Sequence, residues 1–118
     1  MPEKIKLTRR EEDMLKTLWA SDEPMSARAV ANSAGISMNT VQAVLRKLLR
    51  AGCIETAKIG YSGTVLTREY IATVSEEDYY ATVLSPQAVK GLVEHFITND
   101  ATEDDLTEIE QAVKEARQ

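Results

Sequence analysis

The sequence predicts a mainly helical chain with one small β-hairpin, followed by a separate helical domain. In several segments, apolar residues recur at helical spacing behind good N-cap residues. One β-branched stretch has a glycine-rich centre at Gly60-Tyr61-Ser62-Gly63, which is typical of a hairpin. The charge also divides: residues 1–74 hold 11 basic and 8 acidic side chains, whereas residues 75–118 hold 3 and 11. We therefore expect two domains, 1–74 and 75–118, with the first meeting phosphate and the second meeting protein.

Two short helices open the first domain. Thr8 and Glu11 have the spacing of a capping box, which predicts a helix over about residues 9–20. The single Trp19 is expected to anchor the core at the end of this helix. Ser26 is a suitable N-cap for a second helix over residues 27–33, and Gly35 supplies a tight turn into a third.

The third helix, expected over residues 37–51, has two chemically different faces. Ser37 is its N-cap, and Gly52 lies where a left-handed C′ residue is preferred. Its apolar face is formed by Val41, Val44, Leu45, Leu48 and Leu49. The opposite face has amides and cations but no carboxylate, and consists of Asn39, Gln42, Ala43, Arg46, Lys47 and Arg50.

This arrangement predicts a winged helix-turn-helix domain, in which the third helix enters the major groove of DNA and the hairpin is the wing. Arg46 is suited to guanine, and Asn39 or Gln42 to adenine, while Lys47 and Arg50 suit phosphate. On the wing, DNA contacts are expected from Lys58, Tyr61 and Ser62. Two alternatives remain open: the helix could be a core helix with a basic outer face, and the hairpin tip could simply be polar.

The second domain carries two apolar helical stripes with little else to cover them. The stripes are formed by Val89, Leu92, Val93, Phe96 and Ile97, and by Leu106, Ile109 and Val113. Because these helices are too few to enclose a core, we expect two copies of the chain to bury the stripes across a twofold axis. The alternative is that the helices fold back onto the first domain.

Several classes of function are disfavoured by composition. One cysteine and one histidine, far apart, provide no metal site, and no histidine or cysteine stands ready to activate a carboxylate. We therefore expect no enzyme, cofactor or metal. The chain has no apolar run that could cross a membrane and no signal peptide at its start. A cytoplasmic protein that does not contact the membrane is expected.

The order of these features resembles the penicillinase repressors, a family that controls β-lactam resistance genes. The resemblance rests on LTRREEDMLKTLW, SMNTVQAVLRKLLRAGCIE, VSEEDYY and LVEHFITNDATEDDLTEIEQAV, which together span nearly the whole chain. It implies a homodimer that represses transcription by covering an operator dyad in double-stranded DNA. It also implies base contacts from Asn39, Thr40, Ala43 and Arg46.

In family members that respond to β-lactams, a regulatory membrane protease leads to a cut at an Asn–Phe bond in the dimerisation helix, and the resemblance places that bond at His95–Phe96. Imidazole differs from an asparagine amide in shape and donor placement. We therefore predict that this chain either answers a protease of different preference or is released by another signal, and we favour the second.

Two other functions are considered. One is a ligand-sensing winged-helix regulator, in which Tyr79 and Tyr80 could line a pocket. The other is a winged-helix module that binds protein.

Overall fold

The computed structural model describes residues 6–62 and 65–118, except for the side chain of Ser62. The chain divides into two compact units, Met1–Val83 and Leu84–Gln118. The first unit contains α1 (Arg9–Trp19), β1 (Met25–Ser26), α2 (Ala27–Ala34), α3 (Met38–Ala51), β2 (Ile54–Ser62), β3 (Val65–Ala72) and α4 (Glu76–Val83). The second contains α5 (Pro86–Asn99) and α6 (Glu103–Ala116). The mainly helical fold with a small antiparallel sheet is confirmed.

The helix boundaries follow from the capping residues. The Thr8 side chain accepts from the backbone amide of Glu11, whose carboxylate accepts in return from the amide of Thr8, so the expected capping box is present. Ser26 and Ser37 cap α2 and α3: each hydroxyl oxygen accepts from a backbone amide in the first turn, that of Ala29 and that of Thr40. Gly52 ends α3 with φ of 78°, a left-handed conformation that costs glycine little.

The core of the first unit lies where α1, α2 and α3 meet the start of the sheet. Its buried side chains are Met14, Leu15, Leu18, Val30, Ala31, Val41, Val44, Leu45, Leu48, Cys53 and Ile54. Four of these are the apolar face predicted for α3, while Leu49 lies at its margin and is 37% exposed. Burial raises the pKa of the Cys53 thiol, which behaves as a small apolar side chain.

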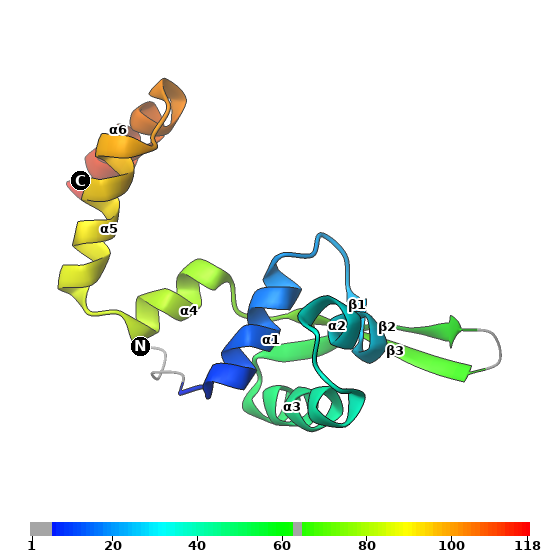
Figure 1. The fold of residues 1–118 in the computed structure, drawn as a ribbon. Coiled ribbons are helices and arrows are strands. Elements are labelled where there is room, and N and C mark those ends of the chain that lie inside the picture. The colour runs from blue at the N-terminus through cyan, green and yellow to red at the C-terminus, as the bar shows by residue number, and fades with distance from the viewer. Residues whose placement is uncertain (1–5, 63–64) are drawn as a thin grey trace. The chain divides into compact units, whose positions relative to one another are not determined.

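The sheet has three antiparallel strands in the order β1-β3-β2. The two-residue strand β1 was not predicted; it pairs Met25 with Tyr70 just before α2 begins. The hairpin strands are longer than expected, because Gly60 and Tyr61 pair with Thr67 and Leu66 instead of forming the turn. The part of the hairpin nearest its tip projects beyond α2 (Figure 1). The predicted turn residue Gly63 lies outside the described residues.

Helix α4 belongs to the first unit, so this unit extends to Val83, whereas the sequence placed the boundary after residue 74. The physical reason is an aromatic cluster. Tyr79 is 2% exposed, and its ring centroid lies 5.7 Å from that of Trp19 and 5.0 Å from that of Tyr80. The Trp19 indole N–H also donates to the Val74 carbonyl oxygen at 2.8 Å, which fixes the segment leading into α4.

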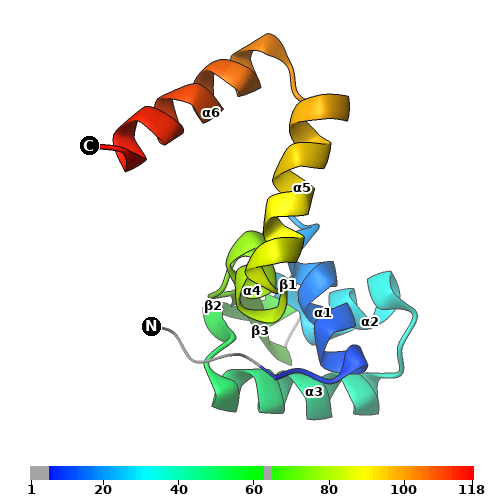
Figure 2. The ribbon, with the colours of Figure 1, turned by 90° about the vertical axis from the view of Figure 1, so that its left-hand side faces the viewer.

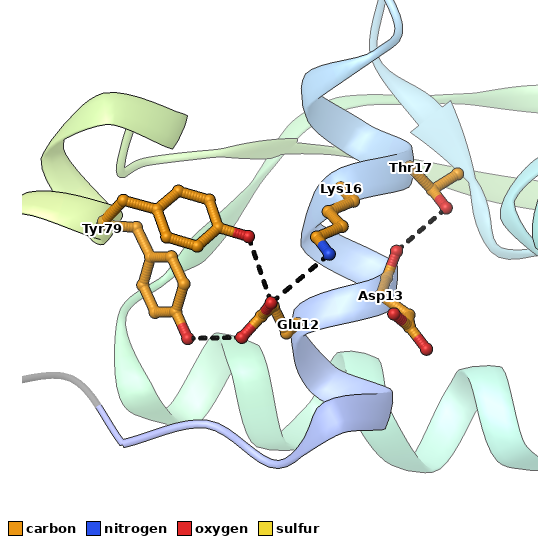
Figure 3. A network of polar contacts seen from close by, with 6 residues as sticks. Glu12, Asp13, Lys16, Thr17 and Tyr79 are labelled. Atoms are coloured by element: carbon orange, nitrogen blue, oxygen red, sulfur yellow. Dashed lines mark hydrogen bonds and ion pairs between the residues drawn. The ribbon is translucent and has the colours of Figure 1, made fainter. Parts of the chain in front are cut away.

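A carboxylate on α1 completes this attachment (Figure 3). The Tyr79 hydroxyl donates to Glu12 Oε2 at 2.9 Å, and the Tyr80 hydroxyl donates to Glu12 Oε1 at 3.1 Å. Lys16 Nζ lies 3.4 Å from the same Oε1. The hydrogen bond from Tyr79 lowers the pKa of Glu12, while burial and the bond to Glu12 raise the pKa of Tyr79 to about 12.

The second unit is a pair of well-capped helices. Ser85 caps α5 with Pro86 in its first turn, and Thr102 forms a capping box with Asp105 at the start of α6, as the sequence predicted. Among the described residues 84–118, no side chain is fully buried. The apolar side chains most exposed are Leu92, Val93, Phe96, Ile97 and Val113, at 39–57%, while Val89, Leu106 and Ile109 are half-buried.

Candidate nucleic-acid interface

Helix α3 presents a continuous exposed ridge opposite the core. Asn39, Ala43, Arg46 and Arg50 follow one another at helical spacing, and all four are exposed. The buried residues Val41, Val44, Leu45 and Leu48 occupy the other side of the helix. Because the cost of exposing that apolar side fixes the rotation of α3, the amide and guanidinium groups must face outward. Figure 2 shows α3 running along one edge of the first unit.

Other predicted contacts lie on the flanks of this ridge. Gln42 is exposed on the flank nearest the wing, and Lys47 is exposed on the opposite flank. Thr40 is half-buried, and its hydroxyl accepts from Ser37 Oγ at 3.0 Å within the cap of α3. Thr40 is therefore held at the helix start, and its contribution to base contacts stays a prediction.

The register of the hairpin separates the predicted wing residues onto two faces. Tyr61 pairs with Leu66 and Ile59 pairs with Arg68, so these four side chains share one face. Lys58 pairs with Glu69 on the other face. Tyr61 is 76% exposed. The side chain of Ser62 lies outside the described part of the chain.

Two arginines that the sequence analysis did not select lie beside the predicted surface. Arg68 on β3 lines a groove of about 310 Å³ together with Gln42 and Arg46 of α3. Arg28 and Arg68 both line a second groove of about 700 Å³ between α2, α3 and β3. Strand alternation could have placed Arg68 on the face of Tyr70, which packs against the core. Arg28, one residue into α2, carried no such signal.

Within residues 6–62 and 65–118, the only ion pair is that between Lys16 and Glu12. The cations on α2, α3 and the wing thus have no carboxylate partner in the described structure. In the same residues, no group of histidine, cysteine and carboxylate side chains could hold a metal ion. No described helix is long and apolar enough to span a membrane.

Tyr79 and Tyr80, which were considered as the lining of a ligand pocket, pack between α1 and α4. The Tyr79 ring is buried against Trp19, and both hydroxyls are bonded to Glu12. Their apolar rings therefore contribute to the packing between α1 and α4.

Comparison with known proteins agrees with this geometry. The model of the penicillinase repressor family matches residues 7–115. A search of curated proteins gave no match. Among solved structures, the chain is similar to Staphylococcus aureus MepR, a transcription regulator of the multidrug efflux pump MepA, with 16% identity and a TM-score of 0.54 over 94% of this chain and 78% of MepR.

Two further solved structures have the same fold. A MepR variant bound to an oligodeoxyribonucleotide is 16% identical, with a TM-score of 0.56 over 93% of this chain and 77% of the variant. Staphylococcus aureus MarR in complex with salicylate and kanamycin is 13% identical, with a TM-score of 0.52 over 94% of this chain and 71% of MarR. At these identities the similarity establishes the winged-helix fold.

Proposed function

Because the chain belongs to the penicillinase repressor family, we propose that this transcriptional repressor acts as a homodimer on an operator dyad. One observation supports the DNA contact above the others: the exposed ridge of α3 carries amides and guanidinium groups without a carboxylate. A repressor of this kind acts sterically, because a dimer bound over a promoter excludes polymerase. Two half-sites also give a small domain adequate affinity and specificity.

The polar and charged side chains of the ridge and its flanks have roles suited to their chemistry. The Arg46 guanidinium can donate two hydrogen bonds to guanine O6 and N7, and Asn39 or Gln42 can pair with adenine. Lys47 and Arg50 bind phosphate, which positions the helix without reading sequence. None of these side chains has a carboxylate partner within the described residues, so each is available to DNA.

A comparison of Arg46→Ala with Lys47→Ala tests this assignment. Arg46→Ala should cost about 1–3 kcal/mol on the cognate site and relax one base preference. Lys47→Ala should weaken binding to all sequences and reduce the salt slope by about one unit for each half-site. Fluorescence anisotropy across a salt series measures both effects. Unchanged affinity in both variants would remove α3 from the interface.

The dimer proposal rests on the exposed stripe of α5. Leu92 and Phe96 are 57% and 41% exposed, and a second copy of the chain can cover them. Phe96→Asp would place a carboxylate in that apolar contact and should yield a monomer by light scattering. Gln87→Asp, which adds the same charge at an exposed position on the other side of α5, is the control and should remain dimeric. A dimeric Phe96→Asp protein would contradict the interface.

We also propose that release from DNA does not use cleavage at His95–Phe96. Both residues are exposed in the middle of α5, where the carbonyl oxygen of His95 accepts from Asn99 Nδ2 at 3.1 Å. A protease selective for asparagine would meet imidazole at this position. The full-length protein should therefore stay intact in cells exposed to a β-lactam. A fragment ending at His95 that accumulates as repression is lifted would overturn this proposal.

A further inference from the structure

A groove of about 700 Å³ lies between the start of α2, the start of α3 and the wing strand β3. Its charged side chains are Arg28 from α2 and Arg68 from β3, and its polar side chains include Asn32 and Gln42. No carboxylate lines it among the described residues. Two cations from separate elements, without a negative partner, make this groove complementary to an anion.

This groove continues onto the surface of α3. The smaller groove of about 310 Å³ shares Gln42, Arg68 and Tyr70 with it and extends to Arg46 and Leu49. An anionic strand that passes Arg46 can therefore continue past Arg68 toward Arg28 along the same side of α3. The two arginines thus extend the positive surface beyond the ridge that was proposed to contact bases.

The wing contributes apolar surface next to Arg68. Ile59, Tyr61 and Leu66 share the face of Arg68 and are 59%, 76% and 52% exposed. Such a face cannot bind phosphate, but it can pack against deoxyribose, whose carbon atoms are apolar. A face with apolar groups at one end and a guanidinium at the other matches the alternation of sugar and phosphate along a DNA strand.

We propose that Arg28 and Arg68 bind phosphates of the DNA strand that borders the bases contacted by α3, with the strand lying in this groove. The inference rests on the proposed DNA-binding function and adds two contacts to it. DNA is favoured over a small organic anion because the groove is continuous with the exposed face of α3. Each guanidinium can donate two parallel hydrogen bonds to phosphate oxygens.

The test measures the salt dependence of operator binding by the full-length protein. We compare the unchanged protein with Arg28→Gln, Arg68→Gln and the double variant. Because the proposed dimer carries two copies of each arginine, each single variant loses two phosphate contacts and should reduce the slope of log K against log salt by about 1.8, and the double variant by about 3.6. Arg117→Gln removes the same charge from an exposed position at the end of α6 and should leave the slope unchanged.

Ethylation interference adds a second readout that does not depend on charge number. Ethylation of the phosphates bound by Arg68 should weaken the unchanged protein but have no further effect on Arg68→Gln. Circular dichroism spectra and unfolding temperatures identify any variant that loses its fold. Where an Arg→Gln variant loses its fold, the same arginine is replaced by lysine. Lysine keeps the charge but cannot donate the paired hydrogen bonds, so this variant should retain the salt slope and bind with lower affinity.

The results separate this inference from the function on which it rests. Slopes that stay unchanged in both arginine variants, while Lys47→Ala lowers the slope, would overturn the groove assignment and leave the repressor proposal standing. A groove that takes a small organic anion would show a benzoate-dependent rise in unfolding temperature that Arg68→Gln abolishes, without a change in slope. That outcome would also overturn the inference.

Discussion

Replacing Glu12 with alanine should loosen the attachment of α4 to α1 within the first unit. The Glu12 carboxylate accepts hydrogen bonds from both Tyr79 and Tyr80. A hydrogen bond to a charged group contributes about 1.5–3 kcal/mol. Because the Glu12 side chain is 27% exposed, water screens it and the low end applies to each bond. Glu12→Ala should therefore cost about 3 kcal/mol in the free energy of unfolding.

Two variants separate the hydrogen bonds from the ion pair. Glu12→Gln keeps one oxygen as an acceptor and should lose about half as much, whereas Lys16→Ala should leave stability nearly unchanged because the ammonium is exposed. Urea denaturation at one fixed protein concentration gives the free energies, since the stability of the proposed dimer would depend on concentration. Near-ultraviolet circular dichroism reports on the Trp19–Tyr79 packing. An unchanged urea midpoint for Glu12→Ala would refute the reasoning.

Three further predictions follow from the first unit. Because the pKa of Tyr79 is raised to about 12, its contribution to stability should be constant below pH 10 and be lost as the pH rises from 10 toward 12. Tyr79→Phe should weaken this alkaline dependence, as measured by urea midpoints across that range. Because the pKa of Glu12 is lowered, its contribution to stability has the opposite pH dependence. It should be fully present above the ordinary pKa of 4.5 and be lost as the pH falls through the lowered pKa. Glu12→Gln should remove this loss of stability at acid pH. Leu48→Ala should cost about 2–5 kcal/mol by thermal or urea unfolding, because Leu48 is fully buried in the core, whereas Leu49→Ala at the margin should cost much less.

The sequence predicted the helices and their caps because those signals are local. Thr8, Ser26, Ser37, Ser85 and Thr102 cap helices with acceptors that lie within three residues of their donors. A pattern of that range is visible without knowledge of the tertiary structure. The apolar face of α3 was predicted for the same reason.

The parts that were missed depend on contacts between distant segments. β1 exists only because Met25 and Ser26 pair with Tyr70 and Glu69 across the sheet. The boundary after residue 74 followed the change in charge, but the contacts of Tyr79 with Trp19 and Glu12 join α4 to α1 across 60 or more positions. The position of Arg68 beside α3 depends on hairpin register, which turn composition alone could not fix.

The later boundary changes the electrostatic argument for DNA binding. Residues 1–74 carry a net charge of +3, but residues 1–83 hold 11 basic and 11 acidic side chains and are neutral. Net charge therefore does not direct this unit to phosphate. At physiological salt a charge is screened beyond about 8 Å, so the cations nearest the DNA decide binding. Five cations lie on α3 and around its neighbouring groove: Arg28, Arg46, Lys47, Arg50 and Arg68. The acidic residues of α1 and α4 include Glu11, Glu12, Glu76 and Glu77. The Glu12 carboxylate accepts hydrogen bonds from Tyr79 and Tyr80 and forms an ion pair with Lys16. A chain with a total charge of −5 can therefore bind DNA, because α3 carries Arg46, Lys47 and Arg50 and no carboxylate within a neutral unit.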